Sequence, residues 1–203
     1  AGSSSNPCDA TYRGPSANSE PETQAVAAYI QANFPDQRGT GAAPADTTGV
    51  FIDLHSYGGY VLWPWSYTGT AAPNATQLAT LGRKMAYFNS YLPGQTGVDL
   101  YTCSGVTTDY AYGELGIAAY TIEMGTAFFQ ACTTFESTIY PANLQTLLYT
   151  AKVVRTPYMT PLGPDSLSVA VSASSVPAGT SVTLIAQAND TRYRQSNGTE
   201  PTQ

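Results

Sequence analysis

Two short runs along the chain have the apolar pattern of strands inside a sheet. Residues 50–55 read Val-Phe-Ile-Asp-Leu-His, four apolar residues around one aspartate, with glycines on both sides. Residues 118–125 form a second β-type run that ends in a glutamate close to a glycine. The first run predicts a strand that is buried on both faces, as in open α/β sheets, where functional residues gather at the carboxyl ends of the strands.

Apolar residues at helical spacing lie before, between and after these two runs. Ser19 and Glu22 predict a capping box at the start of the first helix, Pro93-Gly94 is expected to end the second, and the third ends at Pro157. The positions that define the three helices are Val26, Tyr29, Ile30 and Phe34; Leu78, Leu81, Met85 and Phe88; and Leu144, Leu147, Leu148, Ala151 and Val154. A further strand is expected at 60–63, and a short helix at 109–115.

The composition changes after residue 160. Pro161-Leu162-Gly163-Pro164 is typical of a linker, and polar and apolar residues then alternate over 166–172 and 181–184, with a turn expected at 176–179. The pattern resembles the opening strands of the immunoglobulin-like β-sandwich that follows some exported hydrolases. We therefore expect two parts, residues 1–160 and residues 161–203. Two strands cannot close a sandwich, so the second part is expected to be truncated.

Charge and composition limit the classes of partner and the compartment that we expect for this protein. Lys plus Arg number 8 against 14 Asp plus Glu, which gives a net charge of −6 and argues against nucleic acid as a partner. Only 11% of residues are charged, a composition typical of secreted proteins, and no apolar run is long enough to span a membrane. The chain begins with neither methionine nor a signal core, so we expect it to be processed or cut from a longer one.

The candidate chemistry lies at the ends of the two strands. His55 is the only histidine of the chain, and Asp53, two residues earlier, is expected to point to the same side. Glu123 ends the second strand, where an unpaired carboxylate is costly unless it is matched or used. A lone histidine and a lone glutamate are each commonly structural, but together at two strand ends they suggest half of a metal-hydrolase site.

Several stretches then resemble one family. They are Thr11-Tyr12-Arg13-Gly14 through Ser19-Glu20-Pro21-Glu22, Asp53-Leu54-His55-Ser56-Tyr57, Trp63-Pro64-Trp65 and Thr121-Ile122-Glu123-Met124-Gly125-Thr126. Over about residues 7–157 the chain resembles the C-terminal part of the catalytic domain of zinc carboxypeptidases of the carboxypeptidase A type. The resemblance implies an incomplete α/β fold, a mixed, mostly parallel sheet flanked by helices, and a secreted enzyme that acts on peptides with a free C-terminus.

The resemblance also assigns roles to individual residues. His55 matches the third zinc ligand, Glu123 the general base, and Tyr101 the tyrosine that closes over the substrate. The residues expected to bind substrate are Ser56 and Tyr57 beside the ligand, Thr108 at the floor of the specificity pocket, and Thr126 and Phe128 along it. Because threonine is neither aliphatic nor acidic, we expect apolar or mixed specificity, with the neighbouring Asp109 able to turn inward.

Three cysteines add a structural expectation. Cys103 precedes the Glu123 strand and Cys132 follows it, so the two can bridge under oxidising conditions. We predict a disulfide between Cys103 and Cys132. Cys8 is then left over, and in the resembled family its partner lies upstream.

The departures from the family matter as well. No His-x-x-Glu is present because His55 is the sole histidine, and the family's substrate-binding Asn-Arg pair is absent. We therefore expect the 203-residue chain to be inactive alone, although Asp53 is a possible substitute ligand. The alternative is a non-catalytic descendant that binds peptide or glycan without a metal. Half of an open sheet also leaves an uncovered edge, which predicts association.

Overall fold

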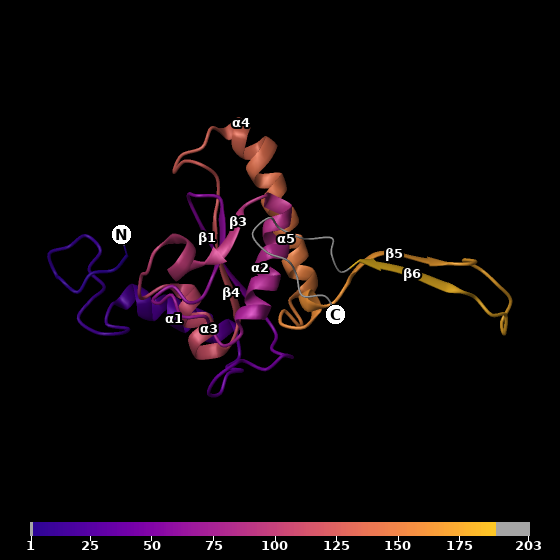
Figure 1. Ribbon diagram of the computed structural model, residues 1–203, viewed down its shortest axis with the longest axis horizontal. Coiled ribbons are helices and arrows are strands. Elements are labelled where there is room, and N and C mark those ends of the chain that lie inside the picture. The colour runs from indigo at the N-terminus through magenta and orange to yellow at the C-terminus, as the bar shows by residue number, and fades with distance from the viewer. Residues whose placement is uncertain (1, 190–203) are drawn as a thin grey trace.

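The computed structural model describes residues 2–189, a mixed sheet between helices with a hairpin projecting from one side (Figure 1). Residue 1 and residues 190–203, the end of the expected second part, lie outside the described residues. The helices are α1 (Pro21–Asn33), α2 (Ala75–Asn89), α3 (Thr107–Leu115), α4 (Cys132–Thr134) and α5 (Tyr140–Val153), with short turns η1 (Thr96–Leu100), η2 (Phe135–Ile139) and η3 (Thr160–Leu162). The strands are β1 (Val50–His55), β2 (Tyr60–Trp63), β3 (Leu92–Gln95), β4 (Ala118–Glu123), β5 (Asp165–Val171) and β6 (Leu184–Asn189).

The main sheet has the order β1-β4-β2-β3. β1 runs parallel to β4 and β2 parallel to β3, while β2 and β4 are antiparallel, so the predicted mixed, mostly parallel sheet is confirmed. The apolar residues of β4 are fully buried, as expected of an inner strand. β1 was expected to be buried on both faces, but it is an edge strand of only intermediate burial, and Leu54 is 50% exposed.

The strand β3 was not predicted, because its residues include Pro93 and Gly94, which we interpreted as the end of a helix. The helix α2 instead ends at Asn89, followed by Ser90 in the left-handed conformation at φ 59°. β3 then pairs only with β2, at the edge of the sheet. An edge position tolerates proline because the missing N–H interrupts no ladder on the open side.

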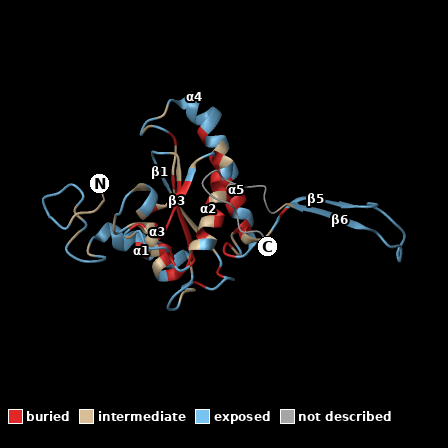
Figure 2. Cartoon of the chain, in the orientation of Figure 1, coloured by how far each residue is buried: buried red, intermediate tan, exposed pale blue. Residues whose placement is uncertain are grey.

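The core lies between α2 and the sheet (Figure 2). Leu78, Leu81 and Met85, three of the four positions predicted for the apolar face of α2, are completely buried. Gly82 allows the helix to approach closely, since a Cβ atom built at this position would lie 2.6 Å from the ring of Trp63. The second predicted helix is therefore confirmed as the one that covers this face of the sheet.

The two outer helices differ in part from the prediction: α1 buries Ile30 but leaves Val26 and Tyr29 exposed, and α5 buries another face than the one predicted. α1 begins after Glu20, which accepts a hydrogen bond from the Ser19 hydroxyl, so the predicted capping box does not form. In α5, Leu148 is 55% exposed, and the buried face is mainly polar. There the Thr146 hydroxyl donates to the backbone oxygen of Met85 on α2. Hydrogen bonds to α2 thus orient α5 more strongly than the spacing of its leucines.

A polar network connects these helices to the loop after β4. Asn89, at the end of α2, donates to the side chain of Asn143 on α5. Asn143 donates to the hydroxyl of Tyr91 at 3.1 Å, and this hydroxyl accepts the backbone N–H of Gly125 at 3.0 Å. Because Gly125 lies two residues after Glu123, the α2–α5 interface helps to set the position of this loop.

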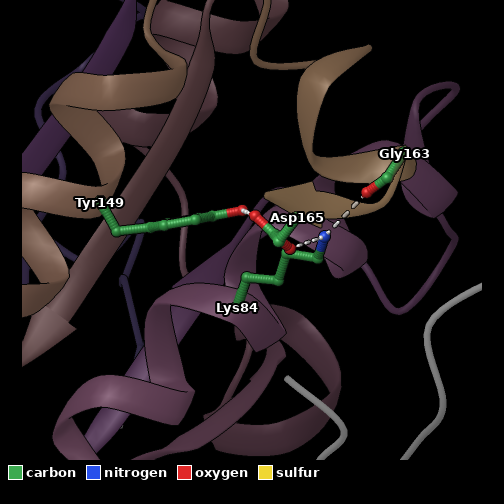
Figure 3. Close-up of polar contacts among 4 residues, drawn as sticks. All are labelled: Lys84, Tyr149, Gly163 and Asp165. Carbon is green, nitrogen blue, oxygen red and sulfur yellow. Dashed lines mark hydrogen bonds and ion pairs between the residues drawn. The ribbon is translucent and has the colours of Figure 1, made fainter. Parts of the chain in front are cut away.

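The segment expected to be a linker is partly built into the body of the protein. Pro161 is buried in the turn η3, and Asp165, the first residue of β5, is paired with Lys84 of α2. Figure 3 shows the Lys84 Nζ atom between the Asp165 carboxylate and the backbone oxygen of Gly163. The hydroxyl of Tyr149 lies 3.5 Å from the other oxygen of Asp165. The entry to the hairpin is therefore anchored to the first part.

Beyond Asp165 the hairpin is exposed to solvent on both strands (Figure 2). β5 lies close to its predicted range, and Thr180 donates to Pro177 in the predicted turn. The second strand begins at Leu184, three residues after the predicted start. Whether this hairpin opens a β-sandwich stays a prediction. Among the described residues, no helix is both long and apolar enough to cross a membrane.

Candidate functional site

The parallel pairing of β1 and β4 brings the two candidate catalytic residues together. His55 and Glu123 are partners in register at the carboxyl ends of these strands. Met124, the next residue, donates its backbone N–H to the backbone oxygen of His55 at 2.8 Å, which holds the two ends in place. The imidazole Nδ1 lies 4.0 Å from Oε1 of Glu123. The two residues, predicted to lie at two strand ends, are therefore direct neighbours at the ends of adjacent strands.

Asp53 lies on the same side of β1 as His55, as the alternation of strand side chains predicts. One of its oxygens, Oδ1, lies 3.2 Å from Nε2 of His55. The other, Oδ2, accepts a short hydrogen bond from the hydroxyl of Thr107, the first residue of α3. Both oxygens of Asp53 are therefore engaged.

These residues face a cavity of about 290 Å³ beside the sheet. Tyr101 and Thr108, two residues predicted to bind substrate, line it; Tyr101 is 44% exposed and Thr108 is buried. The complete lining is Asp53, His55, Leu62, Ser66, Thr96, Leu100, Tyr101, Cys103, Gly105, Val106, Thr107, Thr108, Thr121 and Glu123. The cavity thus combines two carboxylates with apolar and hydroxyl-bearing side chains.

Ser56, Tyr57, Thr126 and Phe128 do not line this cavity. The ring of Phe128 packs edge-to-face on that of Tyr57, with the centroids 4.8 Å apart. Phe128 stays 71% exposed in this arrangement. Thr126 and Phe128 therefore lie outside this cavity, with Phe128 packed on Tyr57, and their role in binding the substrate stays a prediction.

Burial changes the acidity of Glu123. Its side chain is 14% exposed, and desolvation raises its pKa above the ordinary value. His55 acts in the opposite direction, and Asp53 adds to the increase by charge repulsion. The net effect moves the pKa of Glu123 toward neutral pH. This direction suits a group that accepts and returns a proton.

Asp109 does not turn into the cavity, although the sequence allowed it. Its carboxylate accepts the backbone N–H groups of Ser66 and Tyr67, at distances between 2.9 and 3.2 Å. Burial still raises its pKa, more strongly than these hydrogen bonds lower it. Asp109 therefore fastens the loop after β2 to α3, while its neighbour Thr108 lines the cavity.

The predicted disulfide is not formed. Cys8, Cys103 and Cys132 are all free thiols. Cys103 donates its backbone N–H to Ser66 and lines the cavity, whereas Cys132 begins α4 on an exposed segment at the far end of the fold (Figure 1). Burial raises the pKa of the Cys103 thiol, with a contribution from Asp109.

Comparison with known proteins identifies the fold around this site. A model of the zinc carboxypeptidases matches residues 1–148, which contain every residue of the cavity. The chain belongs to the zinc carboxypeptidase family. The predicted resemblance is thereby confirmed.

Among the relatives, carboxypeptidase A4 of Mus musculus is 34% identical over 131 residues, covering 61% of this chain and 28% of the relative. Carboxypeptidase B of Canis lupus familiaris is 29% identical over 153 residues, covering 72% of this chain and 34% of the relative. The crystal structure of carboxypeptidase A from Helicoverpa armigera is similar in fold, with a TM-score of 0.58 and 24% identity over 78% of this chain and 39% of that chain. The chain spans about a third of the length of the curated relatives that it matches.

The family implies a zinc ion, but the described residues do not form a complete site for one. A catalytic zinc takes about three protein ligands. Between residues 2 and 189, no group of three or more histidine, cysteine, aspartate or glutamate side chains is arranged to hold a metal. His55 is the only imidazole, and both oxygens of Asp53 are occupied.

Sequence reasoning missed Thr107 as a member of the site. Its only signal was its position two residues before the short helix predicted at 109–115. The contact with Asp53 joins residues 54 positions apart, so it depends on how α3 packs beside β1.

Proposed function

We propose that this chain carries the general base and one zinc ligand of a carboxypeptidase that removes amino acids from the C-terminus of peptides. The observation that supports this most directly is the pairing in register of His55 and Glu123, both of which line the cavity. A binding module would need neither an imidazole that lines the cavity nor a carboxylate of raised pKa beside it.

In this proposal Glu123 takes a proton from the attacking water and later gives it to the leaving amine. His55 would be one of the residues that hold the metal ion. When bound, the zinc ion would polarise the scissile carbonyl and lower the pKa of water. Because the described residues supply only this one imidazole, we expect the 203-residue chain alone to retain little zinc and to be inactive.

The substrate would be a peptide or protein with a free C-terminus, met outside the cell. Thr108 at the buried end of the cavity carries no charge and a methyl group, which favours apolar or mixed C-terminal side chains. Tyr101, partly exposed at the cavity, is placed to cover the terminal residue. Ser56 and the Tyr57–Phe128 ring pair would contact residues further from the cleaved bond.

The test fuses the upstream catalytic segment of a relative, carboxypeptidase A4 of Mus musculus, to the start of this chain. Peptides with a free and with an amidated C-terminus are then compared in the folded fusion. We expect release of the terminal residue from the free peptide alone. Glu123→Gln should lower kcat by at least about 100-fold, because a general base contributes roughly 10²–10⁴-fold.

Glu114→Gln is the matched control, since Glu114 is exposed on α3 and does not line the cavity. Its activity should equal that of the parent fusion. A folded fusion that binds peptide without cleaving it would favour the non-catalytic alternative. Full activity in the Glu123→Gln variant would contradict the role given to Glu123.

A further inference from the structure

The contacts of Asp53 determine which nitrogen of His55 carries the proton. A carboxylate only accepts hydrogen bonds, so the 3.2 Å contact with Nε2 is attractive when Nε2 is protonated. The other ring nitrogen, Nδ1, lies 4.0 Å from Glu123, which is too long for a hydrogen bond. The nearer of the two carboxylates, that of Asp53, therefore lies on the Nε2 side of the imidazole.

Thr107 fixes the orientation of this acceptor. Its hydroxyl donates to Oδ2 of Asp53, which leaves Oδ1 turned toward His55. Thr107 opens α3, whose C-terminal cap at Gly116 precedes β4, and Asp53 stands on β1 beside it. The row of contacts Thr107–Asp53–His55, in which Thr107 hydrogen-bonds to Asp53 and Asp53 lies 3.2 Å from His55, thus spans two separate elements, so the packing of α3 holds the carboxylate in one position.

We propose that Asp53, held by Thr107, is a positioning residue that keeps His55 in the tautomer with the proton on Nε2 and the lone pair of Nδ1 on the side of Glu123. This inference deepens the proposed function, because Nδ1 is the atom that His55 would offer to a metal. An imidazole binds a metal only through an unprotonated nitrogen, and a hydrogen bond at the other nitrogen selects the tautomer. Asp53 acts through His55 and touches no reacting atom.

The experiment uses the whole 203-residue chain labelled with ¹⁵N-histidine, without metal or substrate. Because His55 is the only histidine, the spectrum contains a single pair of ring nitrogens. Long-range ¹H–¹⁵N correlations at about pH 8, where an ordinary imidazole is neutral, distinguish a protonated from an unprotonated nitrogen. We expect the proton on Nε2.

Asp53→Asn is the decisive variant because it preserves the shape of the side chain. The Thr107 hydroxyl will donate to the amide oxygen, which turns the amide NH₂ toward Nε2, and an NH₂ group donates rather than accepts. We expect the proton to move to Nδ1, with the ratio of the two tautomers changing at least tenfold. Thr107→Val, which frees the carboxylate to rotate, should give a mixture.

Asp46→Asn is the control, since Asp46 is exposed in the loop before β1 and should leave the tautomer unchanged. Backbone amide spectra report in the same samples whether each variant is folded. A proton on Nδ1 in the unaltered chain, or an unchanged tautomer in folded Asp53→Asn, would overturn the inference. Since no catalysis is measured, a failed peptidase assay would contradict the proposed function and leave this result intact.

Discussion

Lys84 and Asp165 form a buried ion pair, with Nζ 2.7 Å from Oδ2 and side chains that are 2% and 8% exposed (Figure 3). Removing one partner would leave a charge in the interior without compensation. We therefore expect Lys84→Met to lower the free energy of unfolding by about 3–5 kcal/mol, measured by urea denaturation.

The double variant Lys84→Met with Asp165→Leu should recover most of this loss, because two packed apolar side chains often replace a buried pair at little cost. A single variant as stable as the parent would show that the pair contributes nothing. Arg155→Met is the control, since Arg155 is exposed.

The raised pKa of Glu123 predicts a pH dependence of stability. The folded state holds the proton of this carboxyl more tightly than the unfolded state does. The contribution of the protonated Glu123 carboxyl to the free energy of unfolding is therefore fully present below the ordinary glutamate pKa of about 4.3. It is lost as the pH rises through the pKa of the folded state. Glu123→Gln removes the penalty of ionisation, so this variant should gain stability relative to the parent chain between about pH 4 and pH 7.

Thermal denaturation of both chains across this pH range tests the prediction. Subtracting the two curves cancels the other carboxyl groups, including Asp109, whose pKa is also raised. A difference that does not change with pH would contradict it.

The free thiols predict three reactive cysteines in the unfolded chain, in contrast to the single one expected with a Cys103–Cys132 disulfide. In the folded chain Cys103 should be alkylated by iodoacetamide more slowly than Cys8 and Cys132, because it is partly buried and its raised pKa lowers the thiolate fraction. Mass spectrometry over a time course measures the three rates. Detection of only one thiol after unfolding without a reductant would contradict this prediction and would show that Cys103 and Cys132 form a disulfide.

Close packing at Gly82 predicts that Gly82→Ala destabilises the fold, although alanine is the better helix former by about 1 kcal/mol. The added methyl group would collide with Trp63, at a cost of about 1–3 kcal/mol. Urea denaturation should give a lower midpoint. Gly39→Ala is the matched control, because nothing lies within 4 Å of its Cβ position.

The exposed edge of the sheet predicts self-association. Among the residues that the structure describes, β1 pairs only with β4, and Leu54 on it is half exposed. We expect sizing with light scattering to detect species larger than a monomer, and Leu54→Lys to reduce them, since a charge on an edge strand opposes pairing with another chain. A monodisperse monomer would contradict this prediction.

The sequence predicted the centre of the molecule better than its outer elements. The β1 and β4 runs were recognisable because apolar residues are concentrated there, and their parallel order placed His55 beside Glu123. β3 escaped prediction because Pro93 and Gly94 interrupt a helix but are tolerated in an edge strand.

The buried face of α5 was not predicted correctly for a different reason. Its leucines have helical spacing, but polar side chains that bond to α2 decide which face is buried, and Leu148 stays exposed. Hydrogen bonds between distant residues leave no periodic signal in a sequence. The contact of Thr107 with Asp53 belongs to the same class, and so do the contacts that draw Asp109 away from the cavity.

The network from Asn89 through Asn143 and Tyr91 to Gly125 has a consequence for protein engineering. A redesign that replaced Asn143 with leucine to make the α2–α5 interface more hydrophobic would look like a purely stabilising change, remote from the catalytic edge. It would also deprive the Tyr91 hydroxyl of a donor and loosen the backbone two residues beyond Glu123. A substitution chosen only for stability at the α2–α5 interface would therefore also change the loop that follows Glu123.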